Sequence, residues 1–68
     1  MDEIIFVVEE DPDGGYTARA LGESIFTEAE DLAELDDRVR EAMKCHFDDG
    51  ESPRLIRLHF VRERVLMA

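Results

Sequence analysis

The sequence predicts an α+β fold in which three strands, one helix and a fourth strand follow one another in a single domain, residues 1–68. Three observations predict this order: an apolar run near the start, a capped amphipathic segment in the middle, and an arginine-rich apolar segment near the end. A chain of 68 residues has room for one domain. Folding buries only about 60% of the surface of so short a chain, so its core is thin.

Residues Ile4–Val8, Ile-Ile-Phe-Val-Val, are expected to form the central strand. Successive side chains of a strand point to opposite faces, so an uninterrupted apolar run needs cover on both faces. The next residues, 9–15, end in a glycine pair and are typical of a hairpin loop. Tyr16–Leu21 then alternates as a second strand, and Ser24–Glu28 is predicted as a short third strand after a tight turn at Gly22-Glu23.

A helix is expected from Asp31 to about Asp48. Asp31 and Glu34 have the spacing of a capping box, in which the first side chain accepts a hydrogen bond from a backbone N–H of the first turn. At 100° per residue one stripe is apolar and should pack on the sheet: Leu32, Leu35, Val39, Ala42, Met43, His46 and Phe47. Two acid–base pairs of the helix have i,i+4 spacing, Glu34–Arg38 and Asp36–Arg40.

Beyond the helix, Arg54–Met67 returns to a strand pattern. A strand, helix, strand crossover within one sheet joins parallel strands, so we expect the last strand beside the first and a sheet order of 3-2-1-4. One helix covers only one face of this sheet. A second copy of the chain is the expected cover for the other, as a homodimer or tetramer whose interface includes residues of the last strand: Arg57, Phe60, Val61, Arg62 and Arg64.

The net charge of −10, from 18 acidic and 8 basic residues, disfavours direct binding to nucleic acids and to anionic membranes. The charge is uneven, because residues 54–68 contain four arginines and only one acidic residue, Glu63. The single cysteine excludes an internal disulfide framework. No apolar run has the length of a membrane span and no signal-peptide pattern opens the chain, so a cytoplasmic location is expected.

Three motifs of this chain resemble the HicB-like antitoxin domain: Gly14-Gly15-Tyr16, Phe26-Thr27 and the helix segment Asp31–Ala42. The resemblance spans nearly the whole chain and implies a fold like a truncated ribonuclease H domain, without nuclease activity, that masks the mRNA-cleaving toxin HicA. The chain departs from the family at Glu23-Ser24, where the family has Pro-Gly, and at Ala29-Glu30, where it has a glycine. We expect no DNA-binding domain after the last predicted strand. The resemblance therefore implies a non-enzymatic, antitoxin-type module or a solitary relative without a toxin.

The candidate binding site is the acidic loop Glu9, Glu10, Asp11 and Asp13, which is either a solvated turn or a patch for a small basic partner such as a HicA-like toxin. The alternative from another class is a small metal-dependent hydrolase or nuclease that uses clustered carboxylates. A third possibility, RNA binding by the arginines of the last strand, lacks aromatic stacking partners in the same stretch.

No catalytic residue, cofactor or metal ion is assigned. Cys45 and His46 are neighbours on the predicted helix and point about 100° apart, so they do not form a nucleophile and base. Together with His59 they lack the ligand spacing of a zinc site. His46 is expected to be a packed, hydrogen-bonded histidine of the core, and Cys45 a partly exposed thiol.

Overall fold

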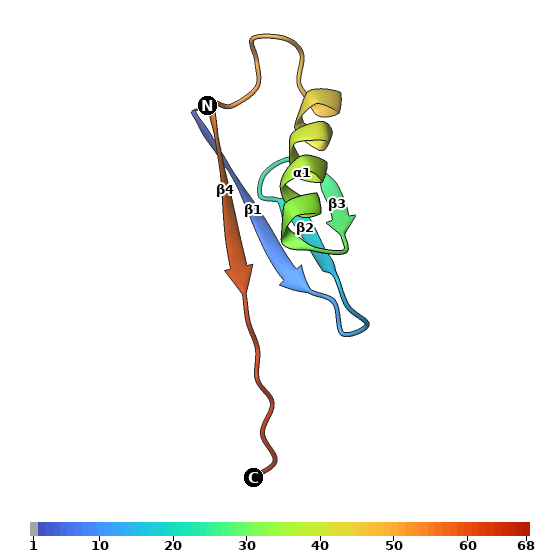
Figure 1. Cartoon of the computed structure of the whole chain (residues 1–68). Coiled ribbons are helices and arrows are strands. Elements are labelled where there is room, and N and C mark those ends of the chain that lie inside the picture. Colours follow the sequence, from blue (N-terminus) through green and yellow to red (C-terminus); the bar gives the residue numbers. More distant parts are fainter. Residues whose placement is uncertain (1) are drawn as a thin grey trace.

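A computed structural model describes residues 2–68 and contains one four-stranded sheet with one helix on one of its faces (Figure 1). The elements are β1 (Glu3–Glu10), β2 (Tyr16–Ala20), β3 (Phe26–Ala29), α1 (Leu32–His46) and β4 (Leu55–Val61). The strand order is β3-β2-β1-β4, with β1 antiparallel to β2 and parallel to β4. The predicted βββαβ order, the sheet order and the parallel pairing are thus confirmed.

The core lies between the sheet and α1. Ile4, Phe6 and Val8 of β1 point toward the helix and are at most 2% exposed. Small side chains on β2 allow the helix to approach the sheet closely. We call this side of the sheet the covered face; the other buried residues of its core are Ala18, Ala20, Ile25, Ala29, Leu35, Val39 and Met43.

Within residues 2–68, no helix lies over the opposite side of the sheet, here called the open face. Its apolar residues include Ile5 and Val7 of β1, which are half-buried, and Leu21 and Phe26, which are 49% and 63% exposed. The register adds Leu55 and Val61 of β4 to this face. The hydrogen bond of 2.9 Å from the Leu21 N–H to the Ile5 carbonyl keeps Leu21 in register beside β1. The apolar run of β1 therefore has intramolecular cover on one face only, where the sequence predicted a need for cover on both.

The helix begins as predicted. The Asp31 carboxylate accepts a hydrogen bond of 2.8 Å from the Glu34 N–H, and this caps the first turn. The helix ends at His46, two residues before the predicted end at Asp48, because the N–H of Phe47 donates to the Met43 carbonyl while its own backbone is already extended.

The charged pairs on the outer side of the helix agree with the prediction in one case of two. Glu34 and Arg38 lie 3.5 Å apart, as predicted. Arg40 lies 3.6 Å from Asp37 instead of pairing with Asp36, since a neighbour at i,i+3 is also within reach on a helix surface.

Several strand boundaries also differ from the prediction, and two of these differences have a clear physical cause. β3 begins at Phe26 rather than Ser24, because Ile25 turns its side chain into the core and residues 21–25 form a wider connection than the tight turn predicted at Gly22-Glu23. β4 ends at Val61, although the strand pattern continues to Met67. Residues 62–68 extend beyond the sheet, and none of the four described strands lies beside them (Figure 1). Among residues 2–68, no helix is long and apolar enough to cross a membrane.

Candidate partner-binding surface

The four predicted acidic residues lie together where β1 ends and the hairpin to β2 begins. Asp11 closes this hairpin, because its carboxylate accepts a hydrogen bond of 2.9 Å from the Asp13 N–H and its carbonyl accepts one of 2.9 Å from the Gly14 N–H. Glu9, Glu10 and Asp13 are exposed. Three of the four predicted residues therefore present free carboxylates, whereas Asp11 also has a structural role.

Gly15 brings this hairpin against the connection between β3 and α1. Its φ is +85°, and a Cβ atom at this position would lie 2.7 Å from the Ala29 carbonyl oxygen. No other residue type fits so close an approach of two backbone segments without displacement. Gly15, one residue of the motif that carried part of the resemblance, thus determines how the hairpin packs.

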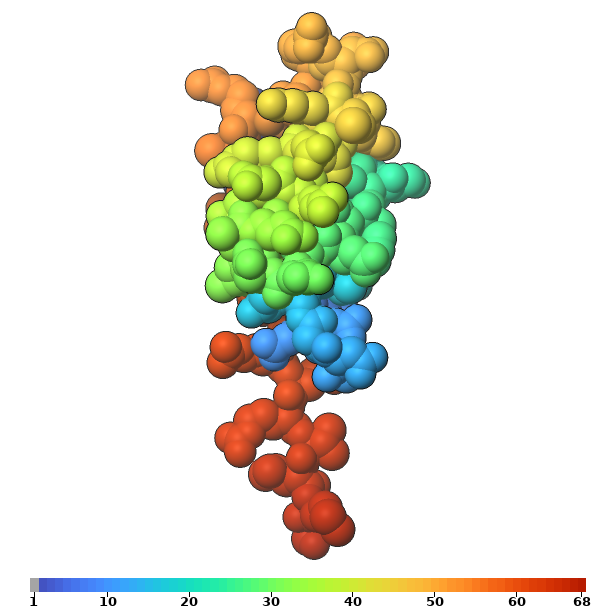
Figure 2. All heavy atoms as spheres, turned by 45° about the vertical axis from the view of Figure 1, so that its right-hand side comes forward, coloured from blue at the N-terminus to red at the C-terminus, as the bar shows by residue number. Residues whose placement is uncertain are grey.

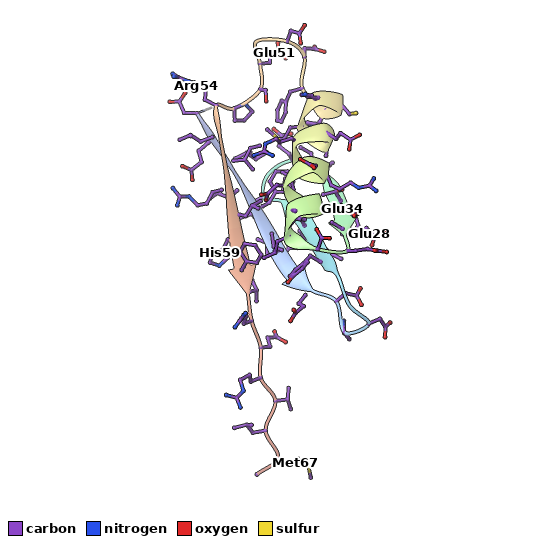
Figure 3. The ribbon with its side chains drawn as sticks, viewed as in Figure 1. Glu28, Glu34, Glu51, Arg54, His59 and Met67 are labelled. Carbon is purple, nitrogen blue, oxygen red and sulfur yellow. The ribbon has the colours of Figure 1, made fainter. Side chains whose placement is uncertain are left out.

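This close approach gathers a second set of carboxylates that the sequence analysis did not assign to the site. A hollow of about 370 Å³ lies between the hairpin and the start of α1. Glu28 and Glu34 lie on this side of the molecule (Figure 3). The one basic residue of its lining, Arg38, is engaged by Glu34. The charged residues that line the hollow are Asp11, Glu28, Glu30, Glu34 and Arg38.

The pairing of β2 with β3 is the signal that could have identified this second set. Tyr16 is paired with Ala29, so residues 28–30 must lie beside the Gly14-Gly15 turn. We call the combined surface the acidic end; its members are Glu9, Glu10, Asp11, Asp13, Glu28 and Glu30. Such a surface attracts basic groups and repels phosphates.

The five residues predicted as an oligomer interface do not form one surface. Arg57 lies on the open face and donates two hydrogen bonds to Glu3, with Nε–Oε1 at 2.5 Å and Nη2–Oε2 at 3.2 Å. These hydrogen bonds hold the pKa of the Glu3 carboxyl below its ordinary value and raise the pKa of Arg57. Phe60 lies on the covered side, edge-on to Tyr16 with ring centroids 6.4 Å apart.

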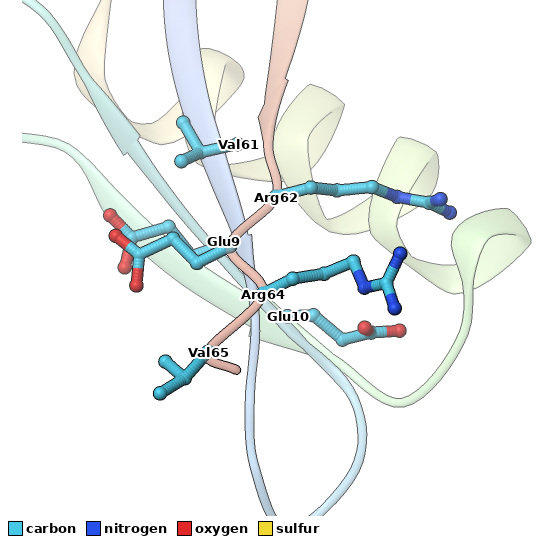
Figure 4. A pocket seen from close by; sticks show the side chains of 7 residues that line it. Glu9, Glu10, Val61, Arg62, Arg64 and Val65 are labelled. Atoms are coloured by element: carbon cyan, nitrogen blue, oxygen red, sulfur yellow. The ribbon is translucent and has the colours of Figure 1, made fainter. Parts of the chain in front are cut away.

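The remaining three members of that set lie at the end of β4 and just beyond it. Arg62 and Arg64 point to the same side as Glu10, while Val61 points to the other side with Glu9 (Figure 4). An open notch of about 820 Å³ separates the end of β1 from this segment. Basic and acidic side chains therefore meet at one end of the molecule.

The prediction that His46 belongs to the core is wrong. Its side chain is 33% exposed, and its Nε2 lies 3.0 Å from Oε2 of Glu23. Because the helix ends at His46, the ring lies at the end of the helix and contacts the loop between β2 and β3. Cys45 is exposed, and His59 is an exposed residue of β4 that points away from the helix (Figure 3). Within the described part of the chain, residues 2–68, no three His, Cys, Asp or Glu side chains are grouped to hold a metal ion.

Comparison with known proteins identifies relatives of nearly the same length. A UPF0150 protein of Archaeoglobus fulgidus is 58% identical over 55 residues, which are 81% of this chain and 82% of the relative. A UPF0150 protein of Thermotoga maritima is 39% identical over 61 residues, 90% of this chain and 86% of the relative. No family model matches the chain, and no solved structure matches it. On the strength of these two relatives, the chain belongs to the UPF0150 family.

Proposed function

We propose that this chain is a non-enzymatic protein-binding module of the HicB-like antitoxin type, and that its acidic end binds a small basic partner such as a HicA-like toxin. The observation that carries the proposal is the acidic end itself. Six carboxylates from the end of β1, the hairpin and the end of β3 gather at one end of the molecule. Asp11, Glu28 and Glu30 line one hollow there, and the single basic residue among the described residues of its lining, Arg38, is paired with Glu34. A basic protein surface would find there a dense set of acceptors for charge-assisted hydrogen bonds.

The packing role of Gly15 supports the link to HicB-like domains. Gly14-Gly15 was one of the motifs that carried the resemblance, and Gly15 holds the hairpin against Ala29. Any change at this position would separate the two halves of the acidic end. The motif therefore serves the same surface that we propose for binding.

The arrangement of the carboxylates favours binding over hydrolysis. A metal-dependent hydrolase of the ribonuclease H type needs carboxylates that converge on shared metal ions, one of them inside the first strand. Here the interior of β1 is Ile5, Phe6 and Val7, and the acidic residues of the hairpin spread outward on the surface. Separate exposed carboxylates suit recognition of a charged surface rather than coordination of one ion.

The test compares two charge-reversed variants. Glu9→Lys/Glu10→Lys changes the acidic end, and Asp49→Lys/Glu51→Lys makes the same change in net charge at the opposite end of the molecule, where Glu51 lies (Figure 3). Wild type and the control are expected to retain a small basic protein when tagged chain is recovered from native extract, or a HicA-like protein when the two are co-expressed. The Glu9→Lys/Glu10→Lys variant should no longer retain this basic partner.

Binding should also weaken as salt is raised, because exposed charges are screened. Two results would contradict the proposal: equal retention by both variants, or no basic partner for any of them. Calorimetric titration with Mg²⁺ and Mn²⁺ tests the enzymatic alternative directly. Specific micromolar metal binding together with a nuclease activity that chelation abolishes would replace binding with hydrolysis.

A further inference from the structure

The last seven residues of the sequence, 62–68, are here called the tail. They continue the direction of β4 past the end of β1 and stand clear of the body of the molecule (Figure 2). Val65, Leu66 and Met67 are 94%, 76% and 98% exposed, more than any large apolar residue of the sheet or helix. Three adjacent apolar side chains so fully in water favour association with another surface.

We propose that the tail adds as an antiparallel strand to the outer edge of β4 in a second copy of the chain, whose own tail does the same in return. In the sheet order β3-β2-β1-β4, β4 is an edge strand that pairs only with β1. The outer N–H and C=O groups of an edge strand are a ready template for another strand. The result is a symmetric dimer with one continuous sheet.

A hollow beside β4 provides a seat for an apolar side chain of the tail. The helix packs over β2 and β3 and leaves the covered side of β4 partly open. Val39 of the helix and Ile56 and Leu58 of β4 form the apolar part of a hollow of about 120 Å³, with Asp36 and Arg40 at its rim. Ile56 and Leu58 are half-buried, so an added leucine would complete their cover.

The tail of the same chain cannot fill this seat. Between Val61 and Met67 the sequence has no Gly, Pro, Asn or Asp, the residues that turns use, so the tail has no means of folding back on its own β4. A second copy has the same edge and the same hollow within reach of an extended tail. Arg62 and Arg64 give the tail a basic character, and the acidic body of another copy attracts it.

The register follows from symmetry and charge. In a two-fold antiparallel pair one residue lies opposite its own copy. A pair centred on Arg62 places Leu66 opposite Leu58, next to the hollow, and brings like charges together only at the centre. A pair centred on Glu63 would oppose two glutamates and set Arg62 against Arg64, and a centre at Arg64 would move Leu66 away from the hollow. We therefore place Arg62 at the two-fold axis.

Sedimentation equilibrium of wild type and two matched variants tests the interface. Leu66→Asp introduces a charge into the proposed seat, and Leu21→Asp makes the same change on the open face. Wild type and Leu21→Asp should be dimers, whereas Leu66→Asp should weaken the dimer on the order of 100-fold, because each dimer loses two buried leucines. Far-ultraviolet circular dichroism confirms that each variant is folded. A wild type that stays monomeric at high micromolar concentration would overturn the proposal, as would loss of the dimer through Leu21→Asp alone.

Cysteine cross-linking tests the pairing and its register. With Cys45→Ser removing the exposed native thiol, Arg62→Cys, Glu63→Cys and Arg64→Cys are each oxidised mildly. Rapid disulfide-linked dimer formation at one of the three positions supports antiparallel pairing, and its absence at all three overturns it. Cross-linking at position 62 supports the register in which Leu66 lies opposite Leu58. Cross-linking at 63 or 64 instead would overturn that register.

Discussion

The two faces of the sheet differ although one strand supplies apolar side chains to both. On the covered face, Ile4, Phe6 and Val8 are at most 2% exposed, whereas Ile5 and Val7 between them on the open face remain half-buried. The sequence of β1 alone does not make this difference. It arises because α1, the one helix among residues 2–68, lies over the covered face. The comparison indicates that the covered face supplies most of the stability of the fold, while the open face and the edge of β4 remain available for contacts.

The valines of β1 provide the sharpest test of this comparison. Val8→Ala on the covered face should lower the free energy of unfolding by roughly 2–3 kcal/mol, because the side chain is fully buried and its removal leaves a cavity. Val7→Ala on the open face should lower it by less than about 1 kcal/mol. Urea denaturation followed by circular dichroism measures both. Equal losses would mean that the open face is also covered in solution.

A second pair of variants tests how the hairpin is held beside the covered face. Gly15→Ala should destabilise the fold by about 2 kcal/mol or more, since it combines a positive φ with a Cβ atom 2.7 Å from the Ala29 carbonyl oxygen. Gly14→Ala has a positive φ but open space around the new Cβ, so about 1 kcal/mol is expected. Thermal unfolding of both variants compares them. Similar losses would show that the close approach to Ala29 is relieved at little cost.

The N-terminal cap of α1 contributes less to the stability of the fold than the close packing of Gly15 does. Asp31→Ala removes the acceptor of the Glu34 N–H and should cost about 1 kcal/mol. Asp37→Ala is the control, because this exposed residue lies 3.6 Å from Arg40 without capping the helix, and its loss should change stability by less than about 0.5 kcal/mol. Urea denaturation separates the two. A loss for Asp37→Ala as large as that for Asp31→Ala would contradict the role of the cap.

The elements of the fold could be predicted because local signals and topology agreed. The apolar run of β1, the Asp31 cap and the parallel crossover each pointed to the same arrangement, and the structure contains all three. Boundaries failed where a tertiary contact decided them: the burial of Ile25 delays the start of β3, and β4 stops where its neighbour β1 ends. A sequence pattern contains no information about where a neighbouring strand runs out.

Only part of the candidate site could be predicted from the sequence, for a related reason. The hairpin carboxylates are consecutive in sequence, so composition alone draws attention to them. Glu28 and Glu30 join them only through the pairing of Tyr16 with Ala29 and the approach of Gly15. The prediction for His46 was wrong for another reason. The helical period placed it on the apolar stripe, but it is the last residue of the helix, and its ring contacts Glu23 of the β2–β3 loop instead of the core.

The smallest expected effect concerns the ion pair between Glu3 and Arg57, which links β1 and β4 on the open face. Arg57 donates two hydrogen bonds to Glu3 and lowers the pKa of its carboxyl. In Arg57→Gln the pKa of Glu3 should return toward its ordinary value of 4.5, whereas Arg54→Gln, which removes the same charge from a nearby exposed position, should leave it lowered. Carbon-13 NMR of the Glu3 carboxyl during an acid titration measures both.

The effect of this ion pair on stability has a defined sign. Because the pKa of Glu3 is lower in the folded than in the unfolded chain, its stabilising contribution is present above the ordinary pKa and is lost as the pH falls through the lowered value. Wild type should therefore be more stable than Arg57→Gln at neutral pH, and the two should converge at acidic pH. The difference should be small, since both side chains are exposed to solvent. If the pKa of Glu3 were unchanged in Arg57→Gln, the pair would not persist in solution and the open face would lack this link between β1 and β4.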